Sequence, residues 1–262
     1  MTPFEGLLLG IIQGLTEFLP VSSSGHLVMG QELLGISLPG VWFEIAVHVA
    51  TLVSVLVVYR ARVTALAVGA VRGERSAWRY VGLLLLATVP AAFVGIFLGD
   101  VVEGLFEAPV VTGLGLLFTG GVLASSRRPL ARDEWIEDGG LRMALVMGLA
   151  QALAIIPGVS RSGATVVTGL WSGVQPERAA EFSFLMAVPA IGGAAVLKLP
   201  ELLANSSGQA GVALFLGAGA AGITGVLAIR TFVVMLRRRS FPAFGAYCVA
   251  AGAAFLGYLA LP

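Results

Sequence analysis

The sequence predicts an all-α integral membrane protein built as an inverted-topology repeat. Hydrophobic residues make up 57% of the chain and charged residues only 12%, and the mean hydropathy is +0.93. A soluble domain of 262 residues could not bury so much apolar surface. A broken polar motif occurs twice, and arginine-rich loops recur between apolar segments at a spacing that reverses the orientation of the second half.

The first copy of the motif, GIIQGLTEFLPVSSSGHL, begins at Gly10, and the second, GLAQALAIIPGVSRSGAT, begins 138 positions later at Gly148. Proline and a run of hydroxyl residues and glycine interrupt each copy, so neither suits one straight spanning helix. Irregular backbone at membrane depth is tolerated only inside protein or beside a water-filled cavity. We therefore expect two re-entrant helical hairpins whose bends line a site.

Three apolar segments follow each hairpin, each about the 20 residues needed to cross the hydrocarbon core. They cover residues 41–59, 80–98 and 109–124 after the first hairpin, and 180–199, 210–236 and 242–261 after the second. The prediction is one polytopic membrane domain with repeat one over about residues 1–126 and repeat two over about residues 142–262.

Arginine is concentrated in the short loops 60–79, 127–142 and 237–239. The positive-inside rule places all three loops in the cytoplasm. Because three spans follow each hairpin, the second hairpin enters from the face opposite to the first. Both termini are then expected on the outer side, and the two hairpin tips are expected to meet inside the membrane.

The bends carry the groups expected to bind phosphate. These groups are Ser22, Ser24 and Gly25 in the first copy and Ser160, Ser162 and Gly163 in the second. A helix that restarts after such a bend points free N–H groups and its positive end at an anion. Arg161 fits this interpretation, because an arginine within a bilayer needs a counter-charge and grips phosphate oxygens with two donors. The alternative is that Arg161 only pairs with Glu17.

The first copy also carries Glu17, Ser23 and His26, where the second has Ile155, Arg161 and Ala164. Glu17 lies one helical turn after Gln13, and a carboxylate beside an amide oxygen suits a divalent cation such as Mg²⁺ or Ca²⁺ that keeps several waters. His26 is a candidate acid, base or nucleophile. Each could instead be a hydrogen-bonded group inside the helix bundle.

Glu44 and His48 share a face of the first full span and are expected to support the hairpin from behind. Charges at the start of a later span, Arg178 and Glu181, are interpreted as solvated helix-end groups. The glycine-rich stretch 216–222 most simply indicates close helix packing, with a homodimer as the alternative. The chain has no nucleotide-binding loop and no pattern that predicts a nucleic acid partner.

These motifs resemble a known family. The stretch QGLTEFLPVSSSGH from Gln13 to His26, PGVSRSGAT from Pro157 to Thr165 and FEIAVH from Phe43 to His48 are similar to bacterial undecaprenyl-pyrophosphate phosphatases, the bacitracin-resistance family. The resemblance implies a metal-dependent enzyme of the bacterial inner membrane that releases the terminal phosphate of a polyprenyl pyrophosphate, with a site open to the outer side. Gln13 departs from the family, in which many members have glutamate.

Our sequence-based mechanism makes Ser23 the nucleophile and His26 its base and later its acid, with His26 or an activated water as the alternative nucleophile. Arg161 and the backbone donors would stabilise the transition state. The rival function is a flippase or transporter for a polyprenyl phosphate, because inverted repeats with broken helices are common in transporters. The asymmetry between Glu17 and Ile155 favours catalysis.

Overall fold

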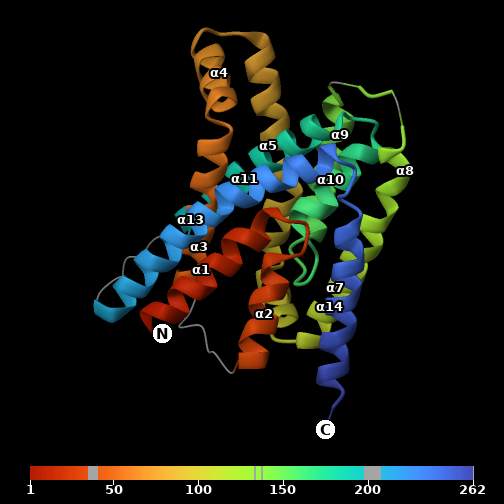
Figure 1. Cartoon of the computed structure of the whole chain (residues 1–262). Coiled ribbons are helices and arrows are strands. Elements are labelled where there is room, and N and C mark those ends of the chain that lie inside the picture. Colours follow the sequence, from red (N-terminus) through yellow and green to blue (C-terminus); the bar gives the residue numbers. More distant parts are fainter. Residues whose placement is uncertain (35–40, 133, 137, 198–207, 262) are drawn as a thin grey trace.

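The computed structural model describes residues 1–34, 41–132, 134–136, 138–197 and 208–261 (Figure 1). Helices are the regular elements of these residues, and the strand-like pairing among them is the isolated bridge between Ile136 and Val174. The prediction of an all-α protein is therefore confirmed.

The first half begins with the predicted hairpin. Thr2 and Glu5 form a capping box that fixes the start of the first helix, and Pro3 occupies its first position. The helices of this half are α1 (Pro3–Phe18), α2 (Ser23–Leu34), α3 (Val41–Val58), α4 (Arg60–Val71), α5 (Arg75–Phe97), α6 (Gly99–Phe106), α7 (Pro109–Ser125) and α8 (Arg127–Leu130).

The second half repeats the order of hairpin and spans. Its helices are α9 (Gly140–Leu153), α10 (Arg161–Trp171), α11 (Pro176–Leu197), α13 (Gly208–Arg237) and α14 (Ala243–Leu259). In the described part of the chain four helices are long and apolar enough to cross a membrane, or up to five if the bent pair α3 and α4 is one span. The protein is thus a multi-pass membrane protein. Part of the predicted span 180–199 lies outside the described residues.

Besides the four-residue α8, two helices were not predicted, because arginines in one segment and acids in the other suggested loops. The first, α4, turns by 80° from the line of α3 and packs on α5, where the Trp78 indole donates to the Ala70 carbonyl at 3.0 Å. The second, α6, lies between α5 and α7. In α4, Leu66 and Gly69 are buried against the rest of the protein, whereas no residue of α6 is buried.

The arginine-rich segments gather at one end of the molecule. Figure 1 shows α4, α8 and the connection from α13 to α14 toward this end, while both chain termini lie toward the other. This relative arrangement agrees with the topology derived from the sequence. That the arginine-rich end faces the cytoplasm stays a prediction.

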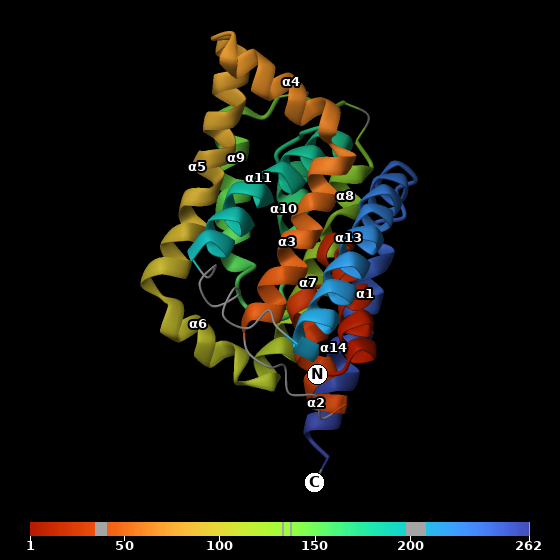
Figure 2. The same cartoon turned by 90° about the vertical axis from the view of Figure 1, so that its left-hand side faces the viewer.

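Each hairpin packs against the opposite half of the chain. The first helix of each hairpin packs against the second full span of the other half, so α1 lies along α13 and α9 lies along α5. The matched glycines of the motif allow this approach: a Cβ on Gly10 would overlap the Gly217 carbonyl, and a Cβ on Gly148 would lie 2.6 Å from the Ala87 oxygen. Figure 2 shows α5 and α6 on one flank, with α1, α13 and α14 on the other. The hairpin tips are thereby brought to the interior.

Candidate functional site

The two hairpin bends share one hydrogen-bond pattern. Ser22 Oγ accepts from the Gly25 N–H at 3.2 Å, and Ser160 Oγ accepts from the Gly163 N–H at 3.1 Å. In both bends two hydroxyls also lie 3.3 Å apart, namely those of Ser22 with Ser24 and of Ser160 with Ser162. Serine before a restarting helix satisfies donors that the helix itself leaves free. The predicted repeat therefore extends to the local geometry of the bends.

The chain reverses differently in each bend. Ser22 itself has φ of +67°, whereas in the second bend Gly158 takes φ of +87° and Ser160 stays extended. The second bend is also anchored by Thr119 of α7, whose hydroxyl donates to the Gly158 carbonyl at 2.9 Å and accepts from the Ser160 N–H at 3.0 Å. Such tertiary anchoring was not visible in the sequence.

The tips of the hairpins meet, as the inverted repeat predicts. The Arg161 guanidinium lies 2.5 Å from Glu17 Oε1, and Ser162 Oγ donates to the Leu19 carbonyl at 3.3 Å. Both charged side chains are mostly buried, with exposures of 15% for Arg161 and 7% for Glu17. A buried ion pair of this kind is stable only while both partners are present.

The second oxygen of Glu17 is surrounded by donors. Ser23 Oγ donates to Glu17 Oε2 at 2.7 Å, and the Gln13 amide nitrogen donates to it at 2.9 Å. We expected His26 beside Ser23, but the structure places the carboxylate there instead. Glu17 is therefore the group positioned to take the Ser23 proton.

His26 has both ring nitrogens engaged. Nδ1 lies 2.8 Å from the Ser22 carbonyl oxygen, and Nε2 lies 2.6 Å from the Tyr247 hydroxyl on α14. The Tyr247 and His26 rings are also nearly parallel, at 9°, with centroids 5.8 Å apart. Sequence reasoning missed Tyr247, because it stands alone in an apolar span 221 positions from its partner.

The pair on α3 lies closer to the site than expected. His48 Nε2 is 3.6 Å from Glu17 Oε2, while its Nδ1 lies 2.6 Å from the Glu44 carbonyl oxygen one turn earlier. His48 thus faces the carboxylate directly, whereas Glu44 contributes through its backbone.

One unpaired oxygen beside Glu17 is available to a divalent cation. Gln13 is fully buried, yet its Oε1 has no hydrogen-bond partner. An orphan amide oxygen beside a carboxylate is a suitable ligand pair for a hard cation. Among the described residues no group of three or more His, Cys, Asp or Glu side chains could form a complete metal cage. The cation would have to be completed by substrate oxygens and water.

Further contacts hold the guanidinium from the side of α11. Arg161 Nη1 donates to the Ser183 carbonyl at 3.4 Å, and the Ser183 and Thr165 hydroxyls lie 2.6 Å apart. Behind Glu17, four phenylalanines from different segments pack edge to face: Phe18, Phe184, Phe232 and Phe241. These rings form part of the hydrophobic core that begins next to Glu17 in the chain.

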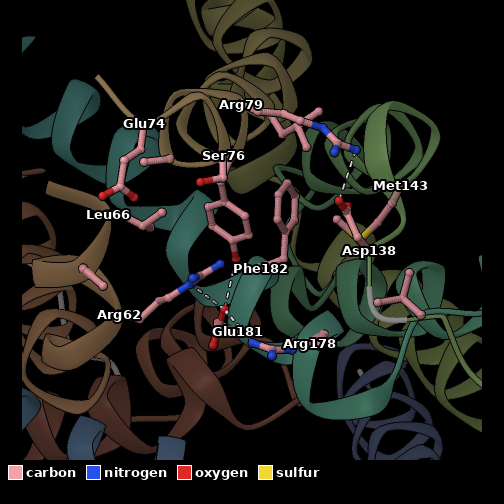
Figure 3. Close-up of a pocket in the computed structure, with 15 residues that line it drawn as sticks. Arg62, Leu66, Glu74, Ser76, Arg79, Asp138, Met143, Arg178, Glu181 and Phe182 are labelled. Carbon is pink, nitrogen blue, oxygen red and sulfur yellow. Dashed lines mark hydrogen bonds and ion pairs between the residues drawn. The ribbon is translucent and has the colours of Figure 1, made fainter. Parts of the chain in front are cut away.

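A cavity of about 380 Å³ is lined by residues of α4, α5 and α11, together with Asp138, Met143 and Val174 (Figure 3). Arg62 and Arg178 point at Glu181, at 3.1 and 3.7 Å, and Arg79 meets Asp138 at 3.1 Å. Glu181 is only 15% exposed, so its interpretation as a solvated helix-end charge was wrong. The guanidiniums of this cavity are balanced by carboxylates, and its lining contains no residue of either polar motif.

One glycine of the α13 stretch, Gly217, serves packing inside the chain. A Cβ on Gly217 would lie 2.8 Å from the Gly6 oxygen and from Phe43, whereas Gly219 meets nothing within 4 Å. Close helix packing therefore accounts for Gly217, and the homodimer stays a prediction.

Comparison with known proteins agrees with the motifs. Residues 6–254 match the family described as bacitracin resistance protein BacA. The chain is 42% identical to an undecaprenyl-diphosphatase of Desulforudis audaxviator, with 96% of each chain covered, and 42% identical to one of Syntrophotalea carbinolica, with 97% and 98% covered. An undecaprenyl-diphosphatase of Desulforapulum autotrophicum is 38% identical over 96% of both chains. The chain belongs to the bacitracin resistance protein BacA family.

Proposed function

We propose that this protein is an undecaprenyl-diphosphatase, which hydrolyses undecaprenyl pyrophosphate to undecaprenyl phosphate and phosphate. Such a reaction recycles a lipid carrier for cell-wall synthesis and would confer resistance to bacitracin. The observation that carries the proposal is the buried contact at which Arg161 and Ser23, from opposite hairpins, bind the two oxygens of Glu17. That contact combines an anion grip, a hydroxyl nucleophile and a base within the membrane.

Substrate binding would activate the site by changing the partner of Arg161. Phosphate and carboxylate compete for the same donors, so the guanidinium would bind the terminal phosphate in place of Glu17. Glu17 Oε1 loses its counter-charge, and Oε2 already accepts from Ser23 at 2.7 Å. The carboxylate is then able to receive the serine proton.

The proposed chemistry has two steps. Ser23 Oγ forms a bond to the terminal phosphorus while its proton passes to Glu17, and the bond to the polyprenyl phosphate breaks. Water then attacks the phosphoserine, giving its proton to His26 Nε2, and Ser23 recovers its own proton from Glu17 as phosphate leaves. Arg161 and the first-turn N–H groups of α2 and α10 stabilise the charge on phosphorus in both steps.

We further propose that Glu17 and Gln13 Oε1 hold a divalent cation, Mg²⁺ or Ca²⁺. The ion supplies charge neutralisation for the diphosphate when it is bound. The unpaired Gln13 Oε1 supports this assignment.

The orientation proposed is that of a bacterial inner-membrane protein with both termini outside and a site open to the outer side. It can be tested by attaching a membrane-impermeant maleimide in intact cells to Asp100→Cys in α6 and to Arg72→Cys beside α4. The native Cys248 is fully buried and gives little background. Labelling of Asp100→Cys alone supports the orientation, and labelling of Arg72→Cys alone reverses it.

The activity is tested by adding undecaprenyl pyrophosphate to the purified protein in detergent, with Mg²⁺, with Ca²⁺ or with a chelator, and measuring released phosphate. Release that requires a divalent ion supports both the reaction and the cation. Release in the presence of the chelator would reject the proposed cation but not the proposed reaction. No release under any condition, with tracer movement of polyprenyl phosphate in proteoliposomes, would favour the flippase.

A further inference from the structure

We propose that Tyr247 is a positioning residue that holds His26 at rest and leaves it when the substrate's diphosphate arrives. This inference rests on the proposed function, because it assigns the mode of entry to the same site. The contact joins α2 to α14, at the 2.6 Å distance between His26 Nε2 and the Tyr247 hydroxyl.

The tautomer of His26 follows from its other contact. A backbone carbonyl only accepts hydrogen bonds, so Nδ1, 2.8 Å from the Ser22 oxygen, must carry a proton. In the neutral ring Nε2 then holds the lone pair, and the Tyr247 hydroxyl donates to it. The ring nitrogen capable of acting as a base is therefore occupied at rest.

Tyr247 is exposed on the side of the molecule from which a lipid substrate would arrive, and few contacts hold its side chain in place. Its side chain is 47% exposed on α14, a helix on the flank of the molecule (Figure 2). Among the described residues its hydroxyl bonds only to His26. A tyrosine held by one hydrogen bond and one ring stack can turn away without leaving a second group unsatisfied. A polyprenyl substrate that arrives from the surrounding lipid would displace the tyrosine, and Nε2 would then accept from the attacking water or from a protonated phosphate oxygen.

The kinetic test compares Tyr247→Phe with Tyr258→Phe, a tyrosine on the same helix with a similar exposure of 45%. If the Tyr247 hydroxyl competes with substrate, Tyr247→Phe should lower KM by about two- to tenfold and leave kcat unchanged. Tyr258→Phe changes neither constant. A fall in kcat at unchanged KM would give the hydroxyl a part in the chemical step and overturn displacement, as would an unchanged KM.

A spectroscopic test reports on the contact without turnover. His26 and His48 are the chain's two histidines, so protein labelled with ¹⁵N-histidine gives four ring signals, assigned with His26→Gln. Tyr247→Phe should shift the His26 Nε2 signal and spare Nδ1, and Tyr258→Phe should shift neither. In the wild-type protein, a polyprenyl methylene-diphosphonate should also move Nε2. An identical Nε2 signal in wild-type and Tyr247→Phe protein would contradict the proposal.

The two tests separate this proposal from the function on which it rests. If wild-type protein releases no phosphate, the proposed function fails. The Nε2 signal of the resting protein still decides whether Tyr247 holds His26, and inorganic pyrophosphate then tests the exchange. No movement of Nε2 with either diphosphate would reject displacement, even where phosphate is released.

Discussion

The two hairpins are built alike at their bends and differ in what they present to each other. Ser23 of the first and Arg161 of the second occupy equivalent positions of the repeat, 138 residues apart. Both side chains contact Glu17, one at each carboxylate oxygen. Glu17 is equivalent to Ile155, so the second hairpin has no carboxylate at this position of the repeat.

This difference separates architecture from chemistry. The shared serines and glycines form the bends and allow the helices to approach, while the residues that differ form the reactive cluster. Changes at positions shared by the two copies should therefore affect stability in both halves. Changes at positions where the copies differ should affect turnover. Four predictions test this division, from the largest expected effect to the smallest.

Replacing Ser23 by alanine should have the largest effect. Loss of the nucleophile should lower kcat by about a thousandfold or more, because no other hydroxyl contacts Glu17 among the described residues. Phosphate release from undecaprenyl pyrophosphate measures it. Thr88→Ala, which removes a hydroxyl bonded within its own helix α5, is the control and should keep its activity. Full activity of Ser23→Ala would move the attack to water or His26.

Arg161→Lys should lower turnover by about a hundredfold while the protein stays folded. A lysine keeps the charge but cannot offer a guanidinium's paired donors to phosphate. Arg178→Lys provides the control, since Arg178 is 47% exposed and pairs with Glu181 rather than with Glu17. Near-normal phosphate release from Arg161→Lys would leave Arg161 with a structural role only.

Gly10→Ala and Gly148→Ala should destabilise the protein by about 1–3 kcal/mol each, because either new methyl group meets backbone of the opposite half. Gly219→Ala and Gly82→Ala add a methyl group to α13 and α5 where nothing lies within 4 Å, and should be harmless. Thermal unfolding in detergent ranks the four. If only one of the two motif glycines proves sensitive, the hairpins are not packed equivalently.

Ser22→Gly and Ser160→Gly should show the smallest effects and differ from each other. Each loses a cap to the following helix, which costs a few tenths of a kcal/mol. At Ser22, with φ of +67°, glycine also relieves the left-handed backbone, so the net change should be near zero or stabilising. The same unfolding assay compares them, and a more stable Ser160→Gly would contradict the difference between the bends.

The fold could be predicted from the sequence largely because hydrophobicity and the repeat act over long stretches. Apolar runs located the spans, and the offset between Gly10 and Gly148 located both hairpins. The helices α4, α6 and α8 were missed because charged residues in these segments suggested loops. Glu181 was misplaced for a related reason, since its partners Arg62 and Tyr80 come from other helices.

The site could be predicted as a set of residues more readily than as a set of contacts. The motifs singled out Glu17, Ser23, His26 and Arg161, but the distances that decide their roles are tertiary. Nothing in the order of the residues indicates that Ser23 faces Glu17 or that Tyr247 faces His26. Those pairings depend on how α14 and the second hairpin pack against the first.

Glu17 and Arg161 are proposed to act together, as one site made from both hairpins. A double-mutant cycle of phosphate release with Glu17→Gln, Arg161→Lys and the double variant tests it most directly. Residues that act as a unit should give a double variant no slower than the slower single variant. Losses that multiply would show that the two residues contribute independently, and would contradict the shared site.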